Sequence, residues 1–117
     1  MSTRIYNFLV IIFSLVIIIG SSIPGNSIPE SYIFRLDKLL HVLEYFIFGY
    51  LLVNSVSDKT QYPLYLSFVL GICFALIDET YQLTVIGRSS SSYDVIADAI
   101  GLTLAIIFNH KFSKILG

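Results

Sequence analysis

Four long apolar runs constrain this chain more than any other feature. They cover about residues 5–20, 34–53, 62–83 and 93–108, and short polar connectors separate them. As helices rising about 1.5 Å per residue, runs of this length can cross the hydrocarbon core of a bilayer. The sequence therefore predicts an all-α fold, an integral membrane bundle of four transmembrane helices, with residues 1–117 forming a single domain.

The composition supports this assignment and excludes several other classes. Hydrophobic residues make up 56% of the chain and charged residues only 13%, and the mean hydropathy is +0.81. A soluble domain this small would need more polar groups to cover its surface. The net charge of −1, without a basic run or aromatic platform, argues against a nucleic-acid partner. The single cysteine, Cys73, excludes an internal disulfide and a CxxC metal site.

The first run has a second interpretation, as a secretory signal, because Arg4 precedes its apolar core. The residues that follow it, Gly20-Ser21-Ser22, make a poor cleavage site, and the run is long for a signal. A retained transmembrane helix is therefore the preferred interpretation.

The basic residues that flank the runs predict the orientation. With four spans, one side carries Arg4, Lys59, Lys111 and Lys114. The other side carries Arg35, Lys38 and Arg88. Because positive residues are enriched on the cytoplasmic side, this bias predicts a multi-pass protein of the cell membrane with both termini in the cytoplasm.

Polar residues interrupt the second run along one side. Asp37, His41 and Tyr45 recur every four residues, so a helix places them in one stripe, and Glu44 lies near it. A helix that is apolar on most of its surface but carries an acid and a histidine on one side needs polar partners. The stripe therefore predicts a polar interior at this end of the helix.

The third and fourth runs supply such partners. Asp78 and Gln82 are four residues apart and so are neighbours on one helix face, with Glu79 beside them. Asp94 and Asp98 open the fourth run with the same spacing. In four antiparallel helices, the start of the second, the end of the third and the start of the fourth meet at one membrane face. We expect the polar residues to converge there.

Acids at helix ends have a simpler interpretation, as interfacial caps in water. This alternative suits Asp94 best, because it follows a serine-rich connector and lies in the first turn. It suits Asp98, His41 and Glu44 less well, because they lie one to two turns further in. A charge near the bilayer centre costs about 2.5–3.5 kcal/mol on insertion scales, so such residues usually pair inward and mark a site.

The charges at this end do not balance. Its basic residues are Arg35, Lys38 and Arg88. Its acidic residues are Asp37, Glu44, Asp78, Glu79, Asp94 and Asp98. With His41 neutral, three negative charges remain in excess, which requires bound protons, a bound cation or exposure to bulk water.

The polar residues form three separated motifs in order. They are Asp37-Lys38-x-x-His41-x-x-x-Tyr45-x-x-x-Gly49, then Asp78-Glu79-x-x-Gln82, then Gly87-Arg88 followed by Asp94-x-x-x-Asp98-x-x-Gly101. Together they resemble the pattern of the VanZ-like family of membrane proteins, over nearly the whole chain. The chain has Ile86 where that family usually has Pro, and Asp98 where it usually has Asn. The resemblance implies a membrane fold, a candidate site and a link to resistance against the glycopeptide teicoplanin.

Three functions remain open. In the first, the protein binds a lipid or lipid-linked cell-envelope headgroup, with basic residues on the phosphate and acids near a cation or amine. The candidate ligand-binding residues are Arg35, Asp37, Lys38, His41, Glu44, Tyr45, Asp78, Glu79, Gln82, Arg88, Asp94 and Asp98. The partners expected under this hypothesis are membrane lipids and a lipid-linked cell-envelope precursor.

In the second, the protein is an intramembrane hydrolase or transferase acting on such a lipid. His41, Asp78 and Glu79 are the candidate catalytic residues, and with Asp98 they are candidate ligands of a divalent cation. No HExxH, GxSxG or P-loop motif supports this hypothesis. In the third, the polar residues form a network that only holds the four helices together.

Two further expectations concern packing and the third connector. Ala97, Gly101 and Ala105 form a ladder of small residues, which predicts close helix packing. Arg88 is expected to fold back onto the acids at the ends of the third and fourth helices, because Gly87 before it permits a tight turn.

Overall fold

A computed structural model of the chain describes residues 3–22, 30–85 and 92–116, with side chains described for 3–22, 38–85 and 93–111. The described residues form four helices and no strand: α1 (Thr3–Ser21), α2 (Glu30–Val56), α3 (Pro63–Gln82) and α4 (Ser92–Leu116). Each helix contains a stretch of 19 or 20 residues that is long and apolar enough to cross a membrane. The predicted all-α bundle of four transmembrane helices is therefore confirmed.

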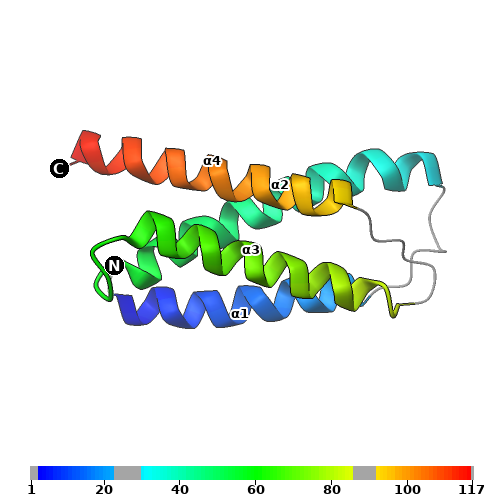
Figure 1. Ribbon diagram of the computed structural model, residues 1–117, viewed down its shortest axis with the longest axis horizontal. Coiled ribbons are helices and arrows are strands. Elements are labelled where there is room, and N and C mark those ends of the chain that lie inside the picture. The colour runs from blue at the N-terminus through cyan, green and yellow to red at the C-terminus, as the bar shows by residue number, and fades with distance from the viewer. Residues whose placement is uncertain (1–2, 23–29, 86–91, 117) are drawn as a thin grey trace.

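The helices run antiparallel in an elongated bundle (Figure 1). The start of α1 and the end of α4 lie at one end of the bundle. The end of α1, the start of α2, the end of α3 and the start of α4 lie at the other, which we call the polar end. Helix α2 packs against each of the other three helices, most extensively against α4. It therefore carries its polar stripe through the middle of the bundle.

The helices differ in length from those predicted. Helix α2 begins at Glu30 and ends at Val56, about one turn beyond the predicted 34–53 at each end, and α4 continues to Leu116 instead of 108. The added residues contain neither glycine nor proline, so nothing in the backbone stops the helix where the apolar run stops. Proline does mark one boundary, because α3 starts with Pro63 at a position where its missing N–H costs nothing.

Small residues let α2 and α4 approach closely. A Cβ added at Gly101 on α4 would meet the backbone oxygen of Val42 and lie 2.9 Å from the backbone nitrogen of Phe46, both on α2. One added at Gly49 would lie 2.9 Å from the Cβ of Ala105. The structure thus agrees with the close packing expected from the small-residue ladder.

Aromatic side chains fill the bundle next to the polar end. Tyr45 is fully buried and packs edge to face on Phe48, with ring centroids 5.9 Å apart. The ring centroid of Phe48 in turn lies 4.8 Å from that of Phe74 on α3. Ile17 and Leu102 complete this core from α1 and α4. The core separates the polar end from the rest of the interior.

Outside, the bundle is covered by large apolar side chains. Phe8, Ile19, Ile77 and Leu83 are each more than 60% exposed, a pattern costly in water and ordinary in lipid. Cys73 belongs to this exposed surface. The apolar surface agrees with a multi-pass membrane protein.

At the end of the bundle opposite the polar end, polar side chains of α1 contact the end of α2 and the short connector after it. Ser55 donates to Asn7, and Lys59 Nζ lies 3.1 Å from the same Asn7 oxygen. Thr3 donates to Asp58 at 2.8 Å, which holds the pKa of that exposed carboxyl below its usual value. These contacts fix the start of α1 against the connector.

Candidate functional site

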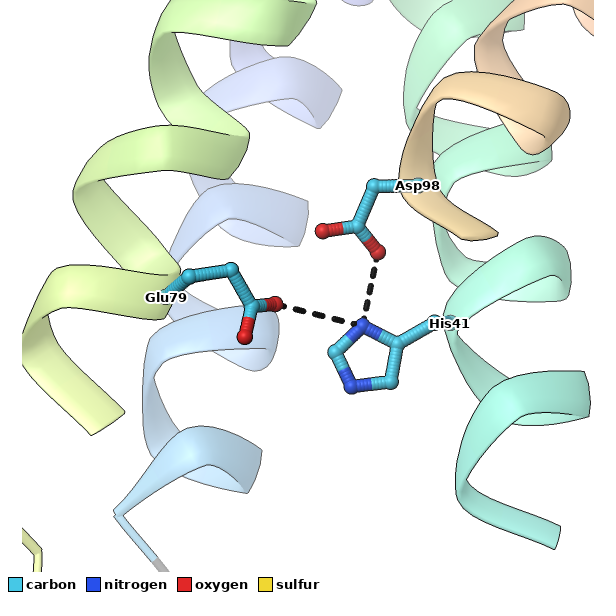
Figure 2. A group of neighbouring side chains, drawn as sticks. All are labelled: His41, Glu79 and Asp98. Carbon is cyan, nitrogen blue, oxygen red and sulfur yellow. Dashed lines mark hydrogen bonds and ion pairs between the residues drawn. The ribbon is translucent and has the colours of Figure 1, made fainter. Parts of the chain in front are cut away.

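Three side chains from three helices meet inside the polar end. The Nδ1 atom of His41 on α2 lies 2.6 Å from Oδ1 of Asp98 on α4 and 3.4 Å from Oε1 of Glu79 on α3 (Figure 2). All three side chains are buried, with exposed fractions of 3%, 0% and 4% for His41, Asp98 and Glu79. We call these three residues the triad.

The triad lies toward one end of the bundle. Glu79 is the fourth residue from the end of α3, and Asp98 is the seventh residue of α4. His41 lies eleven residues after Glu30, where α2 begins.

The second oxygen of Asp98 has no hydrogen-bond partner among the described residues, although it is fully buried. Figure 2 shows it turned away from the ring of His41, toward the side where Glu79 enters from α3. A buried carboxylate oxygen without a partner costs more than an ordinary missing hydrogen bond, because its hydration is lost and not replaced. This oxygen can therefore accept a hydrogen bond from a further donor or bind a cation.

Asp78 belongs to a second group, which joins α1 to α2 and α3. Its Oδ1 accepts from Ser21 Oγ at 2.5 Å, and its Oδ2 accepts from Tyr45 Oη at 3.3 Å. Gln82 donates to the same Ser21 hydroxyl at 3.1 Å. Asp78, Ser21 and Gln82 are all buried. Two hydroxyl donors on one carboxylate favour a positioning role for this group.

Asp94 and Lys38 form a partly buried ion pair between α4 and α2. Asp94 is fully buried, although it lies in the first turn of α4. The alternative that Asp94 caps the helix in water therefore does not describe its position. Lys38 is partly exposed, so it reaches from the membrane face down onto the acid.

The structure describes the positions of the remaining predicted site residues only in part. Glu44 is half-buried on α2. Arg35 and Asp37 belong to the α2 backbone, but their side chains lie outside the described part of the chain. Arg88 lies wholly outside the described residues, so its expected fold onto the acids stays a prediction.

Ser21 is a site residue that sequence reasoning missed. It was assigned to the polar connector after the first run, yet it ends α1 and is 4% exposed. One available signal was its place at the end of a run that must reach the same membrane face as Asp78. A serine beside a second serine in a turn-rich segment gives little reason to expect a buried partner.

The structure also narrows the set of candidate metal ligands. Within the described residues, one ligand atom each from His41, Glu79 and Asp98 lie within 4.8 Å of one another. Asp78, which the sequence had suggested as a fourth candidate, is not in this group. Its carboxylate is held by Ser21 and Tyr45 instead.

Comparison with known proteins gives one match. No curated protein and no solved structure matches the chain. A family model described as VanZ/LLP1 matches residues 2–112, which is nearly the whole chain. Four membrane-spanning helices and the ordered polar motifs agree with that match. The chain therefore belongs to the VanZ/LLP1 family of membrane proteins, a family linked to glycopeptide resistance.

Proposed function

We propose that this protein binds the headgroup of a membrane lipid, or of a lipid-linked cell-envelope precursor, at its polar end. The observation that carries the proposal is the burial of the triad inside a bundle whose outer surface is apolar. Ionisable residues within membrane spans are expensive, and they face the interior where they serve a substrate, an ion or a proton. A lipid headgroup is the ligand that a site near the end of a membrane-spanning bundle would meet first.

The charges of the polar end suit a headgroup that carries both signs. Three basic residues lie in this part of the sequence, and six acidic residues outnumber them. Lys38 lies partly exposed above buried Asp94, where an ammonium group can also meet a phosphate. The excess acids favour a ligand that brings a positive group, such as the amine of phosphatidylethanolamine or a cation bound with the phosphate.

The link of the family to glycopeptide resistance agrees with a ligand in the cell envelope. From the charge bias of the connectors we further propose that the polar end faces outward and both termini face the cytoplasm. A lipid-linked precursor would then present its headgroup on the same side as the triad.

A second candidate function is intramembrane hydrolysis or transfer on the same headgroup. One observation favours it: Asp98 holds Nδ1 of His41 at 2.6 Å, as a carboxylate does when it orients a histidine that acts as a general base. Binding and catalysis are separated by incubating the purified protein with phosphatidylethanolamine, phosphatidylglycerol or a polyprenyl phosphate. Retention of intact lipid supports binding, and release of the headgroup would establish the enzyme.

A purely structural network is the third candidate, and it predicts neither result. In that case none of the three lipids is retained above the level of bulk membrane lipid. Replacing the triad would then change only the free energy of unfolding.

A further inference from the structure

We propose that His41, Glu79 and Asp98 bind a divalent transition-metal ion, with zinc as the ion that fits best. The site stands on its own geometry, whereas its use in holding a headgroup phosphate rests on the proposed function.

The donor atoms are one imidazole nitrogen and two carboxylate oxygens. Imidazole suits zinc, iron, nickel and copper, whereas magnesium and calcium prefer oxygen ligands alone. Zinc sites that act on a substrate use three protein ligands, drawn from histidine, cysteine and carboxylate, and keep a further position open. The donor set therefore favours zinc over magnesium or calcium.

The three donor atoms lie within 4.8 Å of one another, and one pair already has the spacing of a shared ion. Ligands at about 2.0–2.2 Å from zinc lie roughly 3.4 Å from one another in a tetrahedral site. The nitrogen of His41 and the oxygen of Glu79 lie 3.4 Å apart. The 2.6 Å between His41 and Asp98 is instead a hydrogen-bond distance. On binding, the ion would replace the proton between these two atoms and push them apart.

The second oxygen of Asp98 is the independent sign of a missing ligand. It is buried, it has no hydrogen-bond partner within the described part of the chain, and it points toward α3 and away from His41 (Figure 2). Asp98 can thus reach an ion through either oxygen. A bound cation would satisfy this oxygen without any change in the fold.

The negative charge of the triad also favours a bound cation. Two carboxylates of the triad share a buried space in which His41 is the adjacent nitrogen base. In such a space two negative charges need positive charge, as protons or as a cation. A divalent ion would neutralise both acids at once.

Each ligand comes from a different helix, so the ion would join α2, α3 and α4 at the polar end. When bound, it would offer an open coordination position to an oxygen of the headgroup phosphate. Lys38, held by Asp94 on the exposed side, would then meet the same phosphate from above. The polar end would in this way recognise an anionic group despite its excess of acids.

The test uses the full-length protein in detergent, stripped of metal with a chelator. Zinc binding is measured by titration calorimetry and by the rise in the thermal unfolding midpoint, with magnesium as the comparison ion. The variants His41→Gln, Glu79→Gln and Asp98→Asn each remove one ligand, and Asn at position 98 retains an oxygen that can accept from His41. Unfolding curves without metal show which variants are folded.

Asp78→Asn is the matched control. It removes a buried carboxylate from the residue next to Glu79, outside the triad. The hydroxyls of Ser21 and Tyr45, which donate to Asp78, can also accept, so both hydrogen bonds can be kept. A diffuse effect of negative charge would weaken zinc binding in this control as much as in the triad variants.

We expect the wild type to bind one zinc ion and to bind magnesium far more weakly. Each triad variant should lose more than the roughly 10–100-fold in affinity that removal of an outer-shell partner costs. Asp78→Asn should keep far more of the zinc affinity than any triad variant does. Absence of zinc binding by the folded wild type, equal loss in Asp78→Asn, or stronger binding of magnesium than of zinc would overturn the proposal.

A second arm keeps this inference separate from the proposed function. Retention of phosphatidylglycerol and phosphatidylethanolamine is measured on the same samples, with and without zinc. Zinc binding without lipid retention supports the metal site and counts against headgroup binding. Lipid retention by a protein that binds no zinc overturns the metal site and leaves headgroup binding in place.

Discussion

Nδ1 of His41 and Oδ1 of Asp98 lie 2.6 Å apart in the interior of the bundle, although 57 residues separate them in the chain. The contact joins α2 to α4, the two helices that pack most closely. Close backbone approach at Gly101, one turn beyond Asp98, allows two short polar side chains to meet across that interface. The polar site therefore depends on the small-residue packing beneath it.

His41 and Asp98 should stabilise the fold chiefly because each satisfies the buried hydrogen-bonding group of the other. His41→Leu leaves the acids of the triad buried without the imidazole and should cost about 3–5 kcal/mol of the free energy of unfolding. Replacing both His41 and Asp98 by leucine should recover much of this loss, because an apolar pair needs no partner. Equilibrium unfolding of the two single variants and the double variant measures the coupling. Additive losses would show that the two side chains act independently.

Close packing of α2 on α4 predicts that Gly101 cannot be enlarged. Gly101→Ala would place a Cβ against the backbone of Val42 and Phe46, which yields less easily than a side chain, and should cost about 1–3 kcal/mol. Gly20→Ala is the control, since no atom of the described residues lies within 4 Å of its added Cβ. The control should unfold at the same temperature as the wild type or higher, because alanine favours helix. Equal midpoints for the two variants would contradict the close crossing.

Ser21 should be the residue by which α1 supports the site. Ser21→Ala removes a donor to Asp78 and an acceptor for Gln82, both buried, and should cost about 1–3 kcal/mol. Ser14→Ala is a suitable control, because that hydroxyl bonds only the backbone oxygen of Val10 in its own helix. Chemical unfolding of both variants in the same detergent gives the comparison. If Ser21→Ala lowers the free energy of unfolding less than Ser14→Ala does, then α1 does not support the site.

The orientation prediction is tested by accessibility labelling. Single cysteines replace Lys59 and Ser91 in a background that lacks Cys73. An impermeant thiol reagent added to intact cells should label position 91 and leave position 59 unlabelled, because the connector 54–61 is predicted to face the cytoplasm. Labelling of position 59 from outside would reverse the orientation and place the polar end in the cytoplasm.

The sequence predicted the four spans because long apolar runs leave a chain few alternatives in a membrane. It also led to the acids and His41 at one end, since antiparallel helices bring those ends together. It could not predict that His41 would meet Asp98 and Glu79 while Asp78 turned to Ser21 and Tyr45. That division depends on helix rotation and crossing, which periodicity alone does not determine. The predicted ranges of α2 and α4 were too short for a different reason. Polar residues end an apolar run without ending the helix.

Native mass spectrometry of the protein released from mixed phospholipid micelles tests most directly whether the polar end is a ligand site. The wild type is compared with a His41→Gln and Asp98→Asn double variant, which keeps polar side chains at both positions. Asn54→Leu, which removes a polar contact to Asn109 far from the triad, is the control.

Wild type and Asn54→Leu should each retain one phospholipid against increasing collision energy, and the double variant should lose it. Each protein must show a cooperative unfolding transition, so that loss of lipid is not loss of fold. Equal lipid retention by all three folded proteins would contradict the account and leave the triad as a purely structural network.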